Sequence, residues 1–146
     1  METLIDELAA RAQSLASLMT AVARDEVTPA EWLDMLARIG QEQAATRRLA
    51  SLIAQRIGLP KSGSRRMLTY FRRHLGEVVD KDQLGGIAGI HEWARRVREL
   101  RAQGWDIASD QDVTGLKPGQ YTLRSNRQTG SPNTVGDVAD HQARRL

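Results

Sequence analysis

Arginines spaced three residues apart are the side chains of this sequence best suited to chemistry, because together they can grip a polyanion. A helix with 3.6 residues per turn would place Trp93, Val97 and Leu100 on one face. The same period sends Arg95 and Arg98 to the opposite face. A guanidinium fork matches a phosphate and also the O6 and N7 acceptors of guanine. The spacing therefore predicts a helix in the major groove of duplex DNA, with these two arginines touching bases or phosphates.

Further polar residues around this helix are candidates for the same interface. They are His91, Glu92, Arg96, Arg101 and Lys117. Arg96 and Arg101 fall at the edges of the apolar stripe, where they can reach phosphates or cover the core with their methylene stems. Two alternatives stay open at this stage. His91 can cap the turn without touching DNA, and Glu99, four residues after Arg95, can neutralise that arginine.

The elements before this helix have the order of a helix-turn-helix. Ser62 or Ser64 can cap a first helix. Asp80, with Gln83 three residues later, has the form of a capping box for the next helix. Gly89 can take the positive φ that a tight turn between two helices requires. The recognition helix is expected to follow this turn directly.

The residues after Gly89 predict the recognition helix followed by two strands and the loop between them. The recognition helix should span residues 92–104, ending at a glycine. Apolar and polar residues then alternate in two short runs, residues 105–108 and 121–124, as in strands with one buried face. The loop between them, residues 110–119, carries Lys117 and two glycines. We interpret it as a wing that lays a cation against the sugar-phosphate backbone, with a plain hairpin turn as the alternative.

Residues 1–60 predict a helical hairpin. Thr28, Pro29 and Glu31 form a capping box at the start of the second helix, and Gly58 with Pro60 ends it. The first helix carries an apolar stripe made of Leu4, Leu8, Ala12, Leu15, Leu18 or Met19, and Val22. The stripe of the second is made of Trp32, Leu36, Ile39, Ala45, Leu49, Leu52 or Ile53, and Ile57. Two helices cannot bury both stripes alone, so we expect a homodimer through them, with packing on the following domain as the alternative.

Composition limits the other classes of function. The 146-residue chain has 40% hydrophobic and 27% charged residues, which is typical of a soluble globular protein. No apolar run approaches the roughly 18 residues of a spanning helix, and the acidic start is unlike a secretory signal. The chain contains 0 cysteines, which fits a reducing compartment and removes sulfur-ligated zinc. We therefore expect a cytoplasmic protein with no membrane partner.

Catalysis is not expected. The histidines His74, His91 and His141 lie far apart, and no phosphate-binding loop or nucleophile elbow is present in the sequence. Three aspartates near residue 110 could hold a divalent cation, but the hydrogen bonds of turns explain them more simply. The sequence therefore predicts no catalytic residue, no metal and no cofactor.

Basic charge is concentrated in the middle of the chain. Residues 1–60 contain 6 Lys and Arg against 8 Asp and Glu, whereas residues 61–125 contain 12 against 8. A protein that grips phosphates groups its cations on one surface, so this asymmetry favours contact with nucleic acid. Arginines that merely solvate helix surfaces are the alternative.

One stretch also resembles a known family. It reads GEVVDKDQLGGIAGIHEWARRVRELRAQGWDIASDQDVTGLKPGQYTL. It is similar to the small winged-helix module found beside the nuclease domain in HNH-type and other restriction-like endonucleases, most specifically in EWARRVREL and LKPGQY. The resemblance covers about residues 64–124 and implies duplex DNA binding in restriction or phage-related biology. It implies no catalysis, since a separate domain cuts DNA in that family.

Together these patterns predict a mainly α protein with a small β-hairpin, in three parts. They are a helical hairpin for dimerisation or docking (1–60), a winged helix-turn-helix domain (61–125) and a flexible polar tail (126–146). The expected function is non-catalytic binding of double-stranded DNA. The alternative is a docking module that recruits a nuclease or another DNA-processing subunit.

Overall fold

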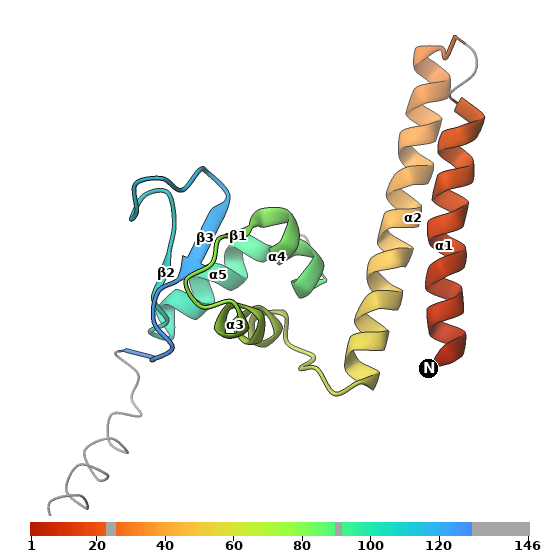
Figure 1. The fold of residues 1–146 in the computed structure, drawn as a ribbon. Helices are drawn as coiled ribbons and strands as arrows, with labels where there is room; N and C mark the ends of the chain where they lie inside the picture. Colours follow the sequence, from red (N-terminus) through yellow and green to blue (C-terminus); the bar gives the residue numbers. More distant parts are fainter. Residues whose placement is uncertain (23–25, 90–91, 130–146) are drawn as a thin grey trace, which may run out of the picture. The chain divides into compact units, whose positions relative to one another are not determined.

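The computed structural model describes residues 1–22, 26–89 and 92–129 of the chain (Figure 1). The chain divides into two compact units, Met1–Lys61 and a second that begins at Ser62. The described part is mainly helical, with a helical pair first and a small antiparallel sheet in the second unit. The expected fold class is thereby confirmed.

The first unit is a pair of long helices, α1 (Glu2–Val22) and α2 (Pro29–Arg56). The predicted capping box starts α2: the amide of Glu31 donates to Thr28 Oγ1 at 3.3 Å, and the amide of Thr28 donates to Glu31 Oε2 at 3.0 Å. The helix ends at Arg56, and Gly58 follows with a φ of 92°. Both ends of α2 are therefore set by the residues that predicted them.

The seam between α1 and α2 is narrower than the sequence predicted. It is lined by half-buried residues, which are Leu4, Leu8, Leu15, Leu18 and Val22 of α1, and Met35, Ile39, Leu49 and Ile53 of α2. At its middle Arg11 pairs with Glu42 at 3.3 Å. Ala12 lies outside the seam and is exposed, which corrects its predicted place on the stripe. One neighbouring helix covers only positions spaced about 3.5 residues apart, and residue 11 occupies that position here.

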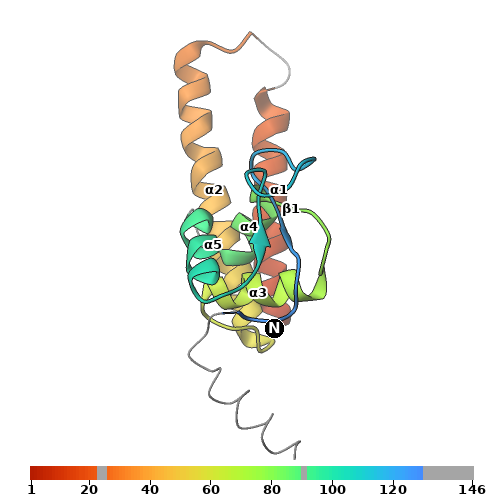
Figure 2. The same cartoon turned by 90° about the vertical axis from the view of Figure 1, so that its left-hand side faces the viewer.

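The second unit gathers three helices and three short strands. The helices are α3 (Gly63–Arg73), α4 (Lys81–Ala88) and α5 (Trp93–Ala102). The strands are β1 (Val79–Asp80), β2 (Ile107–Ala108) and β3 (Gln120–Leu123). Figures 1 and 2 show the helices close together with the strands beside them. The predicted order of three helices and two strands is present, with β1 added between α3 and α4.

Local signals set the starts and the turn of these helices. Ser62 caps α3 by accepting from the amide of Arg65, and Asp80 Oδ1 accepts from the amides of Asp82 and Gln83, each at 2.9 Å. Gly89 follows α4 in the left-handed conformation, with a φ of 71°, as the turn before α5 requires. The helix α5 starts at Trp93 with Glu92 at its N-cap, close to the predicted boundary.

The sheet has three strands in the order β1-β3-β2, not two. Tyr121 of β3 pairs with Val79, while Leu123 and Thr122 pair with Ile107 and Ala108. The predicted alternation of burial is wrong, because Ile107 and Ala108 are both buried, at 3% and 0% exposure. Alternation requires one face of a strand to meet water. In strands this short the adjoining segments cover the second face as well.

Buried residues from every element of the second unit form one core. They are Met67, Phe71, Val79, Leu84, Ala88, Val97, Leu100, Ile107 and Leu123. The chain beyond β3 returns to the end of α5, where the amide of Thr129 donates to the carbonyl of Gly104 at 2.7 Å. Gln128 likewise donates to the carbonyl of Gln103 at 2.6 Å. In the predicted flexible tail, Gln128 and Thr129 are thus bonded to the residues that end α5, and residues 130–146 lie outside the described part.

Replacement of the α4 cap tests its contribution to stability. We expect Asp80→Ala to lower the free energy of unfolding of the second unit by about 1 kcal/mol, because two first-turn amides lose their acceptor. Denaturant unfolding followed by tryptophan fluorescence measures the change. The matched control is Asp110→Ala, whose carboxylate accepts, among the described residues, from the neighbouring Gln111 side chain and from no backbone amide. Equal loss of stability in both variants would contradict the assignment.

Candidate nucleic-acid interface

The helix α5 separates its apolar and basic faces as predicted. Val97 and Leu100 are 2% and 1% exposed, and Trp93 packs edge-on against Tyr121 with ring centroids 5.8 Å apart. Arg95 and Arg98 are exposed on the other side. Because the apolar face is fixed in the core, α5 cannot rotate these two arginines out of solvent without exposing buried leucine and valine.

Two carboxylates flank Arg95. Its Nη1 lies 3.6 Å from Glu92 Oε2, and its Nε lies 3.4 Å from Glu99 Oε1. The pairing with Glu99 is the one that the four-residue spacing predicted. About 60% of the Arg95 side chain is exposed, so water screens both pairs. Such exposed pairs hold a side chain loosely.

Arg98 is a different case from Arg95. Among the described residues it has neither an ion pair nor a side-chain hydrogen bond, and it is exposed. The second unit has five more exposed cations of this kind in its described part, which are Arg65, Arg73, Lys81, Lys117 and Arg127. These side chains are available to phosphates without the loss of an existing contact.

Arg96 and Arg101 are engaged within the protein. Arg96 Nη1 lies 3.0 Å from both carboxylate oxygens of Glu99 and the side chain is only 29% exposed. Arg101 Nε donates to the carbonyl of Ile107 at 2.8 Å, and its Nη2 donates to Asp112 at 3.2 Å. The guanidinium of Arg101 also lies 5.9 Å from the ring centre of Tyr121. Arg101 therefore joins the last turn of α5 to the strands and the wing loop.

The wing loop between β2 and β3 begins with a tight turn. The amide of Ser109 donates to Asp112 Oδ2 at 2.9 Å, and the amide of Asp112 donates back to the carbonyl of Ser109 at 3.0 Å. The bond from the Ser109 amide, followed by the bond from the Ser109 hydroxyl and the charge of Arg101, holds the pKa of Asp112 below its ordinary value of 3.8 against the opposing effect of desolvation. The hydrogen bonds of the turn therefore explain why an aspartate lies at this position, as the sequence indicated.

The far end of the wing carries Lys117. Its backbone amide donates to Gln120 Oε1 at 2.8 Å, which fixes the chain just before β3, while the side chain is exposed. Gly119 follows with a φ of 82°, and its carbonyl accepts from the amide of Lys81 at 2.8 Å. In Figure 1 the loop extends beyond the helices of this unit. Lys117 therefore lies on a loop that is bonded at both ends to the rest of the unit: Asp112 accepts from Arg101 of α5, and Gly119 accepts from Lys81 at the start of α4.

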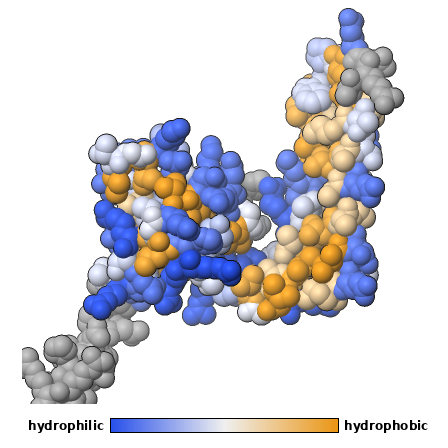
Figure 3. All heavy atoms as spheres, in the orientation of Figure 1, coloured by the Kyte–Doolittle hydropathy of each residue, from blue (hydrophilic) through white to orange (hydrophobic). Residues whose placement is uncertain are grey.

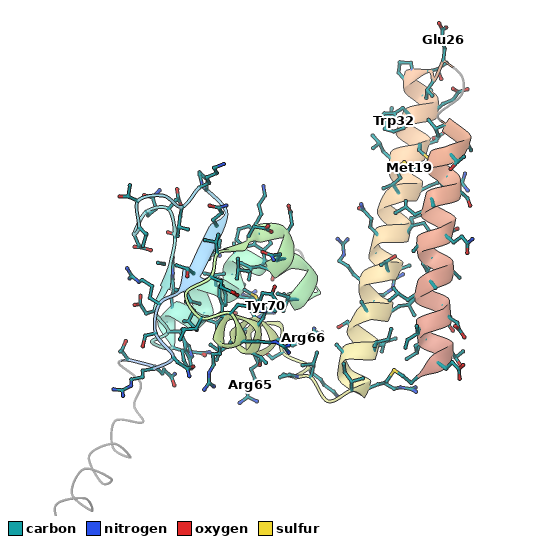
Figure 4. The ribbon with its side chains drawn as sticks, in the orientation of Figure 1. Met19, Glu26, Trp32, Arg65, Arg66 and Tyr70 are labelled. Carbon is teal, nitrogen blue, oxygen red and sulfur yellow. The ribbon has the colours of Figure 1, made fainter. Side chains whose placement is uncertain are left out.

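Arginines of α3 were not among the predicted site residues, and the structure separates their roles. Figure 4 shows Arg65 directed away from the unit and Arg66 running along α3. Arg66 is 8% exposed and its Nη2 donates to the carbonyl of Ala88, at the end of α4, at 3.2 Å. Arg72 lies 5.6 Å from the ring centre of Trp105 and bonds to Asn126. Charge alone could not distinguish these three uses, although the seven-residue spacing of Arg65 and Arg72 places both on one helix face.

The predicted site residues thus fall into three groups. Arg95, Arg98 and Lys117 are exposed cations, with Glu92 beside Arg95. Arg96 and Arg101 make internal contacts. His91 lies outside the described residues. In the described ranges no group of three His, Asp or Glu side chains could hold a metal ion, and no helix could cross a membrane.

The second unit is a small three-helix domain with a three-stranded sheet and an arginine-bearing third helix. Residues 64–124 match the KpnI N-terminal domain family, a domain related to the N-terminus of the restriction endonuclease KpnI. The restriction-related resemblance seen in the sequence is thereby confirmed for this segment. No curated protein and no solved structure matches the chain.

The lowered pKa of Asp112 predicts an acid-sensitive wing. A carboxylate whose pKa is depressed by folding contributes stability that is present above its ordinary value of 3.8 and is lost as the pH falls through the folded pKa. We expect Asp112→Asn to be less stable than the parent at neutral pH and to lose less stability on acidification. Thermal unfolding between pH 6 and pH 3 measures both effects. The control is Asp110→Asn, and parallel pH curves for parent and Asp112→Asn would contradict the prediction.

Proposed function

We propose that the second unit is a winged helix-turn-helix that binds double-stranded DNA, with α5 in the major groove and Lys117 of the wing at the backbone. The observation that carries this proposal is the outward face of α5, where Arg98 is exposed and unpaired among the described residues. The proposal assigns no catalytic step to the chain. We place the binding in the cytoplasm, because a chain with 0 cysteines is typical of a reducing compartment.

The helix-turn-helix geometry supports a fixed presentation of α5. Gly89 ends α4 in a left-handed turn, and Arg66 bonds to the carbonyl of Ala88 just before it. Val97 and Leu100 then anchor α5 in the core. A recognition helix needs this rigidity, since a base contact depends on side chains that reach the groove in one orientation.

The carboxylates near Arg95 do not prevent its use. Exposed ion pairs contribute about 0–1 kcal/mol, so Arg95 can exchange Glu92 and Glu99 for a phosphate at small cost. They do lower the net positive charge of the face. We therefore assign contacts to Arg95 and Arg98 and a tuning role to Glu92, while Arg96 and Arg101 position the helix and the wing.

The family match supports the same function. Residues 64–124 are similar to a domain of a restriction endonuclease, a class of enzyme that acts on DNA. The middle of the chain also carries the excess of basic residues. DNA binding is the function that both observations favour.

Salt dependence tests the proposal directly. The purified chain should bind a random-sequence duplex, measured by fluorescence anisotropy at ~50 and ~200 mM salt. With about four phosphate contacts the affinity should fall by about 100-fold across this range. Absence of binding at the lower salt would overturn the proposal and favour a protein-docking module.

Removal of Arg98 should weaken DNA binding. We expect Arg98→Ala to lower duplex affinity by about tenfold, since a good base contact contributes about 1–3 kcal/mol, and the Arg95→Ala, Arg98→Ala double variant to lower it further. If Arg98 contacts phosphate, the salt slope should fall by about one unit. Arg38→Ala, an exposed arginine of the other unit, is the matched control. A folded double variant that binds as tightly as the parent would refute the assignment.

Substitution of Glu92 distinguishes two roles of its carboxylate, restraint of Arg95 and direct contact with a base. If it only restrains Arg95, Glu92→Gln should tighten duplex binding, because a carboxylate 3.6 Å from that arginine is removed. The same anisotropy titration measures the change, with Glu77→Gln as a control outside α5. Weaker binding by Glu92→Gln would instead show that the carboxylate itself contacts a base, as Glu can with cytosine N4.

A further inference from the structure

The helical hairpin exposes an unusual amount of apolar side chain. Neither α1 nor α2 contains a buried residue in the chain by itself. Large apolar side chains are exposed along both helices; they include Ile5 (50%), Met19 (44%), Leu33 (67%), Leu36 (47%) and Ile57 (64%). Figure 4 places Met19 on α1 and Trp32 on α2 near the same end of the hairpin. A surface of this kind on a helical pair indicates an interface.

These residues lie on one face beside the seam, which we call the apolar face. On α1 it consists of Ile5, Ala9, Ala12, Ala16 and Met19. On α2 it includes Leu33, Leu36, Gly40, Ala50, Ala54 and Ile57. The α1 set recurs every three or four residues, one position after a seam residue. On α2 the same spacing holds at each end, and the two positions between Gly40 and Ala50 are the polar residues Gln43 and Arg47. Because the helices are antiparallel, the two stripes lie on the same side of the hairpin, and Figure 3 shows apolar residues along both helices there.

We propose that a second copy of this chain covers the apolar face, with the two hairpins aligned antiparallel in a four-helix bundle. The second unit of the same chain is a poor alternative. In its described part only Leu75 and Val78 are large apolar side chains that are exposed. They cannot match a face that extends along the full length of α1. Another hairpin offers the same length, the same spacing and the same chemistry.

The charges along the helices are complementary in the antiparallel alignment. The first half of α2 carries Glu31 and Asp34, and the second half carries Arg47 and Arg48. An antiparallel copy therefore places the acidic stretch of one α2 beside the basic stretch of the other, twice in the dimer. In the same alignment the acidic start of α1, residues 2–7, lies beside residues 13–22 of α1 in the other copy, and those residues contain no charge.

The size of the apolar face is sufficient for a stable dimer. A helix of 21 residues, the length of α1, is about 31 Å long. Two adjacent helices give a face about 20 Å wide, so each copy buries about 600 Å² and the pair about 1,200 Å². This total exceeds the roughly 1,000 Å² that a specific interface needs.

The centre of the apolar face contains small residues. Ala12 is the midpoint of the α1 stripe, and the adjacent pair Arg11–Glu42 brings Ala12 level with Gly40 of α2. Glycine inside a helix lowers its stability relative to alanine. A Cβ at Gly40 would meet no atom within 4 Å, so the hairpin alone gives no reason for glycine there. Close approach of a partner helix at the two-fold axis does give one.

The mass of the full chain in solution tests the proposal. Light scattering after size-exclusion chromatography should give twice the 16.2 kDa of one chain. Ala12→Glu should shift the protein to monomer, because it adds a charge at the centre of the apolar face. Ala10→Glu is the matched control, since it adds the same charge to an exposed alanine on another side of α1, and it should stay dimeric. Circular dichroism checks that both variants keep their helices.

A monomeric parent chain would overturn the proposal, and so would an Ala12→Glu variant that stays as dimeric as Ala10→Glu. Neither measurement contains DNA, so the outcome is independent of the proposed DNA binding.

Cross-linking tests the alignment. The chain has 0 cysteines, so Gly40→Cys introduces a single thiol near the two-fold axis. It should form a disulfide-linked dimer on oxidation, whereas Gln41→Cys, one residue along and off the apolar face, should not. A Gly40→Cys variant that cross-links no better than Gln41→Cys would overturn the antiparallel alignment.

Discussion

Burial of Val97 and Leu100 against α3 and the sheet is the interaction on which the second unit depends. It fixes the rotation of α5, because a turn about the helix axis would expose side chains that are at most 2% accessible. Every other feature of the candidate interface follows from that rotation. Arg95 and Arg98 point outward since they are opposite the buried pair, and Arg101 reaches the strands since it lies at the edge.

Arginine has three physical roles in this unit. Buried beside α4, Arg66 satisfies a helix-end carbonyl at the turn, and half-buried Arg96 pairs with Glu99. Arg101 joins a helix, a strand and a loop through two different acceptors. Only an arginine that makes no such contact within the described part of the protein, such as Arg98, is fully available to a polyanion. The net charge of a segment therefore overstates the number of cations that can bind phosphate.

The two units differ in how much side-chain burial offsets the loss of conformational entropy on folding. The second buries a core contributed by every one of its elements, and its tail residues Gln128 and Thr129 bond to the residues that end α5. The first has one narrow seam with an ion pair at its middle and no fully buried side chain. Helices gain most of their stability in proteins from packing of an apolar face. This contrast is the physical reason to expect a partner for the hairpin.

Local sequence by itself determined the helices, their ends and the separation of faces on α5. The capping boxes at Thr28 and Asp80 and the left-handed Gly89 act within four residues, so their types and spacing were enough. Tertiary structure alone decided that β1 joins the sheet, that Ala108 is covered and that Ala12 lies outside the seam. It also decided which arginines are engaged. These outcomes depend on contacts between residues far apart in the chain, which no local pattern of polarity encodes.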